Sequence, residues 1–175
     1  YTSLHGNVRT VELMQRWCEL AAFAPVMRSH EGNRPDDNLQ YDSSEELLAC
    51  FALWSRVHAH LAPYVRHLCA EASERGLPAQ RPLFLHYPED SSLFALQDQY
   101  LYGADLLVAP VIEQGADARQ VVLPGDQDWV HCWTGERFAP GTHQVSAPIG
   151  RPPVFYRPDS AFALLFAALA GVVKQ

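Results

Sequence analysis

The sequence predicts an α/β region followed by a small antiparallel β-sandwich, and a change of periodicity along the chain supports this order. In the first 90 residues, apolar side chains recur at helical spacing around one strand-like run. After residue 80, short β-rich runs alternate with turn signals such as Thr134-Gly135 and Pro140-Gly141. The chain has 175 residues, 48% of them apolar, which is enough to build a core and excludes wholesale disorder. We therefore expect one domain over 1–90 and a second over 91–175.

A first helix is expected after Thr10, which can cap it, with Glu12 in the first turn, where a carboxylate is favoured. The apolar face of this helix repeats at i, i+3, i+4 and i+7: Met14, Trp17, Cys18 and Ala21. The apolar run 23–27, broken by Pro25, predicts a buried strand that leads into a polar loop.

A long helical pattern follows, from about residue 44 to residue 75. Ser43 and Glu46 have the spacing of a capping box at its start. Gly76 and Pro78 mark its end, and Pro63 is expected to kink it. The first region thus predicts helix, strand, loop and helix.

The second region predicts strands within 82–87, 106–112, 120–123, 129–133 and 153–156. In the fourth of these, alternation places Trp129, His131 and Trp133 on one face and Val130 and Cys132 on the other. We expect an antiparallel sandwich from this pattern.

Charge and composition exclude several classes of partner. Twenty acidic residues against 13 Lys and Arg give a formal charge of −7, so no nucleic-acid partner is expected. The longest apolar stretch, 162–173, is too short to span a bilayer, so no membrane partner is expected either. The four cysteines lie far apart and predict free thiols in a reducing, cytoplasmic compartment. His58, His60 and His67 lack the spacing of a zinc site, so no metal or other cofactor is predicted.

The loop over residues 28–38 is the leading candidate for a functional site. An apolar run that ends in Arg28 and His30 and opens into a polar loop is how α/β barrels build active sites. The alternative is that these side chains only satisfy the loop backbone. Trp129, Trp133 and Tyr156 offer a second candidate, a stacking platform for sugars, although alternating aromatic residues also suit a sandwich core.

Several runs together resemble the end of the catalytic region in glycoside hydrolase family 31. They are RW at 16–17, AFAPVMRSH at 22–30, LAPY at 61–64, GLPAQRPLF at 76–84 and QYLYGADLLVAPV at 99–111. The resemblance implies the last elements of a (β/α)8 barrel followed by a β-sandwich. Within the family, YTSLHGN at 1–7 and HEGNRP at 30–35 are most similar to the sulfoquinovosidases, which cleave α-glycosides of 6-deoxy-6-sulfoglucose.

The resemblance also implies roles for three residues. His30 matches a histidine that hydrogen-bonds sugar hydroxyls, Tyr1 is placed to help hold the sulfonate, and Arg28 supports the end of the strand. The two catalytic Asp residues that retaining hydrolysis requires belong to earlier barrel strands, so no residue of this chain is assigned a catalytic role. Because the chain starts at Tyr1 rather than Met, we expect the true N-terminus to lie upstream.

We therefore expect part of a retaining α-glycosidase that acts on α-sulfoquinovosides, inactive by itself. Its expected partners are a small glycoside substrate and either the remainder of the barrel or further copies of the chain. One alternative is an α-glucosidase or α-xylosidase of the same family. The other is a non-catalytic carbohydrate-binding or structural module that uses the Trp129 and Trp133 platform.

Overall fold

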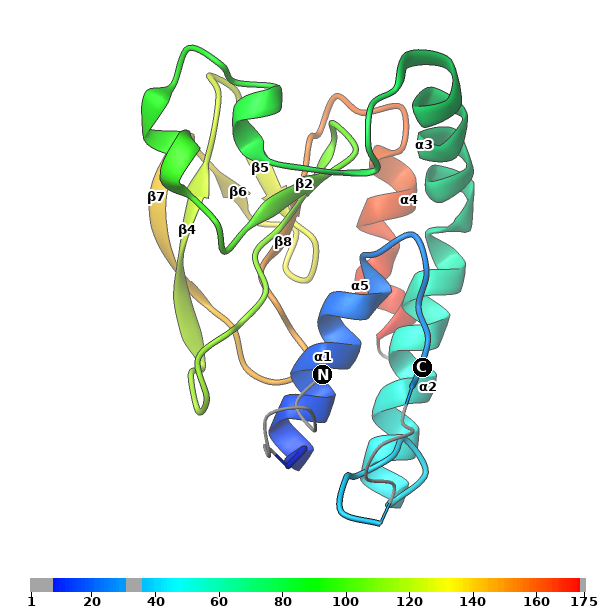
Figure 1. Ribbon diagram of the computed structural model, residues 1–175. Coiled ribbons are helices and arrows are strands. Elements are labelled where there is room, and N and C mark those ends of the chain that lie inside the picture. The colour runs from blue at the N-terminus through cyan, green and yellow to red at the C-terminus, as the bar shows by residue number, and fades with distance from the viewer. Residues whose placement is uncertain (1–7, 31–35, 174–175) are drawn as a thin grey trace.

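The computed structural model describes residues 8–30 and 36–173, which form a helical layer beside an antiparallel sheet (Figure 1). Three helices come first: α1 (Val11–Ala22), α2 (Glu45–His60) and α3 (Ala62–Arg75). The strands follow, and two short helices, α4 (Ala163–Ala167) and α5 (Leu169–Val172), return to the helical layer. Helix α1 lies between α2 and the sheet region. No helix of the described residues is long and apolar enough to cross a membrane.

The ends of the three long helices follow from local hydrogen bonding. The Thr10 hydroxyl accepts from the Leu13 N–H at 3.2 Å, which confirms the predicted cap of α1. Helix α2 is capped by Ser44, one residue later than predicted, because the Ser43 hydroxyl accepts from the Gln40 N–H instead. The predicted break falls at Leu61, between α2 and α3, and places Pro63 in the first turn of α3, where its missing N–H costs nothing.

Two predictions for the first region are wrong. Trp17 is 57% exposed, whereas the polar side chains Gln15, Arg16 and Glu19 are buried on α1. Arg16 and Glu19 form hydrogen bonds with the sheet region, and Gln15 donates to Glu46 of α2. The run 23–27 forms no strand, and Val26 is 71% exposed. A strand needs a hydrogen-bonded neighbour, and no described strand lies beside this segment.

The sheet region consists of antiparallel pairs in two sheets. The larger sheet has the order β1-β2-β3-β8-β5-β6, and β4 pairs only with β7. The strands are β1 (Gln80–Arg81), β2 (Tyr100–Tyr102), β3 (Leu106–Val108), β4 (Ala118–Leu123), β5 (Trp129–His131), β6 (Arg137–Phe138), β7 (Gly141–Ser146) and β8 (Val154–Tyr156). Four of the five predicted strands are present in shortened or similar form, but 82–87 holds the 3₁₀-helix η2 (Leu83–Leu85) instead.

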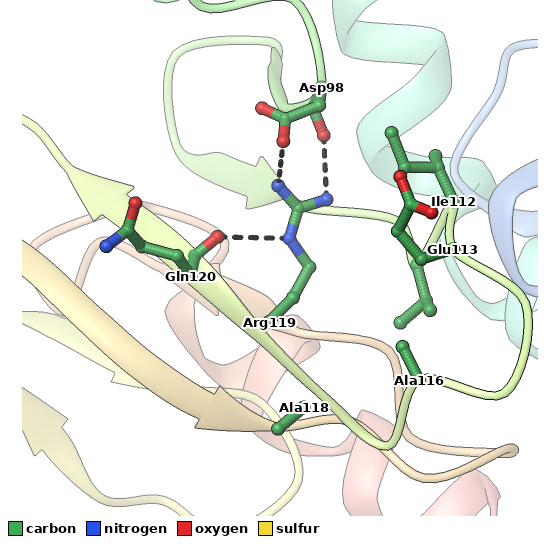
Figure 2. Close-up of a pocket in the computed structure, with 8 residues that line it drawn as sticks. Asp98, Ile112, Glu113, Ala116, Ala118, Arg119 and Gln120 are labelled. Carbon is green, nitrogen blue, oxygen red and sulfur yellow. Dashed lines mark hydrogen bonds and ion pairs between the residues drawn. The ribbon is translucent and has the colours of Figure 1, made fainter.

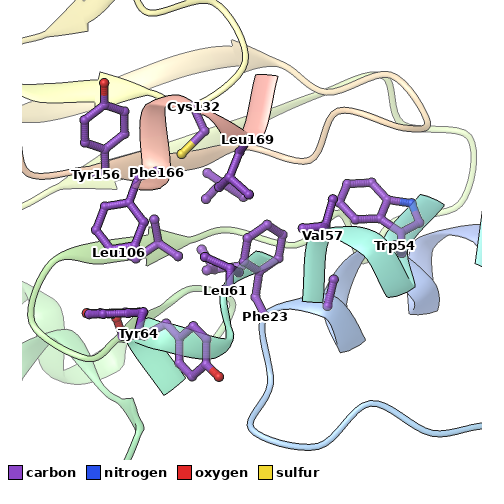
Figure 3. Packing of buried hydrophobic residues seen from close by; sticks show 14 of the residues in the cluster. Phe23, Trp54, Val57, Leu61, Tyr64, Leu106, Cys132, Tyr156, Phe166 and Leu169 are labelled. Atoms are coloured by element: carbon purple, nitrogen blue, oxygen red, sulfur yellow. The ribbon is translucent and has the colours of Figure 1, made fainter. Parts of the chain in front are cut away.

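Two apolar cores lie on opposite faces of the larger sheet. Along β3, Leu106 and Val108 join the core shared with the helices, whereas Leu107 joins the core within the sheet region. Figure 3 shows the shared core, to which Phe23, Trp54 and Phe166 belong. The two-layer sheet region agrees with the predicted sandwich.

The predicted faces of the run 129–133 are partly wrong. Trp129 lies in the core of the sheet region, but Trp133 lies in the shared core with Val130 and Cys132. The alternation fails because β5 ends at His131 and the chain turns over 132–134.

Candidate functional site

Three segments that are separate in the sequence meet around the backbone of His30. Arg9, immediately before the cap of α1, donates from its guanidinium to the carbonyl of His30 at 3.4 Å and to that of Leu39 at 3.1 Å. The Arg9 N–H donates to the side-chain oxygen of Asn38 at 3.0 Å. Arg9 therefore ties the start of α1 to both ends of the loop 30–39.

The imidazole of His30 is exposed and is contacted by the second predicted residue, Arg28. Nη2 of Arg28 lies 3.1 Å from Nδ1 of His30. Because a guanidinium can only donate, Nδ1 acts as the acceptor, and the ring proton is assigned to Nε2. The ring thus offers an N–H donor to a ligand oxygen. The guanidinium group of Arg28 adds positive charge beside the ring, which favours an anionic group nearby.

The structure describes two of the three predicted site residues. It places Arg28 and His30 in contact, whereas Tyr1 lies outside the described residues. The roles of all three stay predictions. Sequence reasoning did not single out Arg9 or Asn38. Asn38 is buried, whereas its described neighbours Asp36 and Asp37 are exposed. The sequence indicates only that Arg9 precedes the predicted helix cap Thr10, and this position alone does not predict a role in the site.

The second candidate, the aromatic platform, is not available to a ligand. Trp129, Trp133 and Tyr156 are at most 8% exposed, and the two indole N–H groups donate to the carbonyls of Pro124 and Pro152. A stacking platform requires exposed ring faces, so the platform prediction is wrong. These rings belong to the cores.

The histidines of the helical layer are held apart by separate partners. His58 contacts the carbonyl of Ala22 at 3.3 Å, and His60 contacts that of Leu165 at 2.9 Å. Within residues 8–30 and 36–173, no group of three His, Cys, Asp or Glu side chains is placed to hold a metal ion. The four cysteines are free thiols, as predicted, with Cys18 and Cys132 buried and Cys69 exposed.

Two hollows in the surface lie away from His30. One, of about 140 Å³, is bordered by Arg119, which donates to the backbone and carboxylate of Asp98 at 2.9 and 2.7 Å (Figure 2). The other, of about 390 Å³, is polar and lies around Arg157 and Asp105. Neither hollow is lined by Arg9, Arg28 or His30.

The chain belongs to glycoside hydrolase family 31. Residues 5–68 match the TIM-barrel domain of glycosyl hydrolases family 31, and residues 76–162 match the C-terminal domain of that family. In the structure, β1 at 80–81 already pairs with β2, so the sheet begins close to the second match. The predicted boundary at residue 90 stays a prediction.

Among the relatives that this chain resembles are two sulfoquinovosidases. The chain is 56% identical to one from Agrobacterium fabrum over 97% of its own length and 26% of the relative's, and 51% identical to one from Escherichia coli over 98% and 25%. A solved sulfoquinovosidase from E. rectale, in complex with an aza-sugar inhibitor, superposes with a TM-score of 0.90 at 46% identity, over 98% of this chain and 26% of that one. The chain thus spans about a quarter of the length of these relatives.

Proposed function

We propose that this chain supplies the substrate-binding histidine and the sheet domain of a retaining α-glycosidase that hydrolyses α-sulfoquinovosides. The observation that carries the proposal is the identity of 51–56% to sulfoquinovosidases over nearly the whole chain. In this proposal, residues 1–90 belong to the last part of a (β/α)8 barrel, and the protein acts in the cytoplasm without a cofactor.

The chemistry of the His30 cluster supports an anionic sugar. A sulfonate keeps its negative charge at every physiological pH, and the guanidinium group of Arg28 lies next to the His30 ring. His30 would donate from Nε2 to a sugar hydroxyl, and Tyr1 would donate its phenol proton toward the sulfonate, which Phe could not do.

The proposal places the bond-breaking groups outside residues 1–175. Retaining hydrolysis needs two carboxyl groups about 5–5.5 Å apart, one as nucleophile and one as general acid and base. The sugar is first transferred to the nucleophilic carboxylate as the aglycone leaves with a proton from the acid. Water, deprotonated by the same group, then releases the sugar. We propose that the 175-residue chain alone holds the sugar poorly and does not turn it over.

An α-glucosidase or α-xylosidase of the same family is the alternative that shares the barrel and the histidine. A purely carbohydrate-binding module is disfavoured, because the aromatic platform on which it depends is buried.

The test is hydrolysis of an α-sulfoquinovoside by the complete protein that contains this chain, followed by NMR of the anomeric proton. We expect the α-anomer of sulfoquinovose to form first, before it equilibrates in water. Absence of turnover, or initial release of the β-anomer, would contradict the proposal. The 175-residue chain serves as the control and is expected to release no sugar.

A further inference from the structure

Helix α1 meets the sheet region through a buried ion pair in addition to its apolar side chains. Nη1 of Arg16 lies 3.1 Å from Oε2 of Glu19, and the two residues are 8% and 1% exposed. Nη2 of Arg16 donates to the carbonyls of Ala116 at 2.8 Å and Ala147 at 2.9 Å. One charged side chain therefore holds two backbone segments that are 31 residues apart in the sequence.

These two segments belong to two of the connections that cross between the two sheets, and we call these two connections the crossovers. Residues 109–117 lead from β3 to β4, and residues 147–153 lead back from β7 to β8. They are bonded to each other, because the Ala147 N–H donates to the Asp117 carbonyl at 2.6 Å. In Figure 1, the crossover after β7 runs to α1. Arg16 thus bonds both crossovers at the point where they lie together.

The carboxylate of Glu19 completes the contact on the second crossover. Its Oε1 accepts from the Gly150 N–H at 2.6 Å, while Oε2 pairs with Arg16. Burial raises the pKa of Glu19, so its charge depends on these donors. A neighbouring carboxylate, Glu12, accepts from the Gly115 N–H at 2.7 Å and extends the same contact toward the start of α1.

These directional contacts affect the position of α1 more than they affect the free energy of folding. A buried ion pair loses hydration on folding, and this loss offsets most of the attraction between the charges. An apolar face of equal size would hold the helix as firmly but would let it slide along its axis or rotate. Three hydrogen bonds join Arg16 and Glu19 to the crossovers, and together they select one arrangement of α1 there.

The position of α1 in turn sets the position of the candidate site. Arg9 precedes the cap of the helix by one residue and binds the carbonyls of His30 and Leu39. We propose that Arg16 and Glu19 are positioning residues, through which the sheet domain fixes the start of α1 and thereby the backbone of His30. The effect of this coupling on catalysis rests on the proposed function. The structural coupling between the crossovers and the His30 backbone is independent of the proposed function.

The experiment uses the complete protein with Glu19→Gln, which keeps the shape of the side chain and removes its charge. A second variant, Arg16→Lys, keeps the positive charge, but one ammonium group cannot span both carbonyls and Glu19. The matched control is Glu71→Gln, because Glu71 pairs with the buried Arg81 and likewise joins a helix, α3, to the sheet at β1. The readouts are hydrogen exchange of peptides covering 26–30 and 147–153, and kcat and KM for the α-sulfoquinovoside.

We expect both variants to raise exchange in 26–30 as well as in 147–153, and to lower kcat about tenfold, with KM changed less than twofold. The control leaves exchange in 26–30 and kcat unchanged. The proposal is overturned if exchange rises only in 147–153, if the control has the same effect as the variants, or if both variants unfold at the assay temperature. If the wild type does not hydrolyse the sugar, the proposed function fails, and the exchange at 26–30 alone decides the coupling.

Discussion

Helix α2 contacts the sheet region through apolar rings, whereas α1 adds buried charges to its apolar contacts. On the first side, Trp54 of α2 packs edge-on against Trp133 with ring centroids 6.0 Å apart, and Phe23, the C-cap of α1, lies against both indoles. On the second side, Arg16 and Glu19 bind backbone groups of the two crossovers. Both contacts join the same two regions of the molecule.

The two contacts have different effects: one mainly stabilises the fold, and the other mainly fixes the position of α1. Apolar burial is proportional to area and has little direction, so the α2 side supplies free energy of folding. The α1 side binds particular carbonyl and N–H groups, so it selects one arrangement. It is also the side that leads to Arg9 and His30. The contact that contributes less to stability is therefore the one that the candidate site depends on.

The largest expected loss of stability is on the apolar side. Trp54→Ala removes an indole that is 1% exposed and packs against Phe23 and Trp133. We expect the free energy of unfolding to fall by about 4 kcal/mol, from lost transfer energy and the remaining cavity. Urea unfolding of the 175-residue chain measures it, with the exposed Trp17→Ala as control. Equal losses for the two variants would contradict the assignment of Trp54 to the shared core.

At the contact between α1 and the crossovers, a single substitution is expected to lower the free energy of unfolding more than a double substitution. Arg16→Met leaves Glu19 buried beside no cation and is expected to cost about 3 kcal/mol. Adding Glu19→Leu removes the uncompensated charge, so the double variant should regain at least half of that loss. Urea unfolding at pH 7 compares the three chains. A double variant less stable than the single one would mean that the pair acts mainly through its net attraction.

Acid sensitivity is expected to arise in the sheet region, at His131. Burial lowers the pKa of His131 to about 4, with Arg151 a smaller cause, against an ordinary value of 6.5. The unfolded chain therefore binds more protons between these values, so stability is full above pH 6.5 and is lost as the pH falls toward 4. The contribution is about 2 kcal/mol, since the ring is 6% exposed.

His131→Phe, which keeps an aromatic ring beside Phe138 and Phe155, should flatten the stability curve between pH 6.5 and 4. Urea unfolding across this range provides the measurement, and His143→Phe in β7 is the control. An unchanged slope in His131→Phe would show that other groups cause the acid sensitivity.

The smallest effect is expected at the start of α1. Thr10→Ala removes the acceptor for the Leu13 N–H and should cost about 1 kcal/mol. Ser44→Ala is the matched change on α2, where Ser44 caps through the same bond to Leu47. Hydrogen exchange in 26–30 separates the two, because only the Thr10 cap adjoins Arg9. Exchange raised equally by both variants would argue against a special link between α1 and His30.

Local signals predicted the helices better than they predicted the helix faces. The Thr10 cap, the break near Pro63 and the end of α3 at Gly76 all depend on a few neighbouring residues, and the sequence displays them directly. Which face of α1 is buried depends on its partner instead. Arg16 and Glu19 are buried because backbone groups of residues 116, 147 and 150 meet them, and no pattern within the helix indicates such distant donors and acceptors.

Pairing across the sheet was equally hard to predict. The strand predicted over 82–87 is a 3₁₀-turn, and β7, a run of mostly polar residues, was missed because its strand character comes from pairing with β4. At the site, the sequence singled out Arg28 and His30 but did not predict the contact between their side chains. The role of Arg9 could not be anticipated, because it bonds across 21 and 30 residues of chain.

The central claim is the preference for a sulfonated sugar, and the most direct measurement is kcat/KM of the complete protein for an α-sulfoquinovoside and for the matching α-glucoside. We predict a ratio of about a hundred or more in favour of the sulfonated substrate, which corresponds to roughly 3 kcal/mol of differential transition-state binding. Equal values, or a preference for the glucoside, would contradict the account and would leave an ordinary α-glucosidase of family 31 in its place.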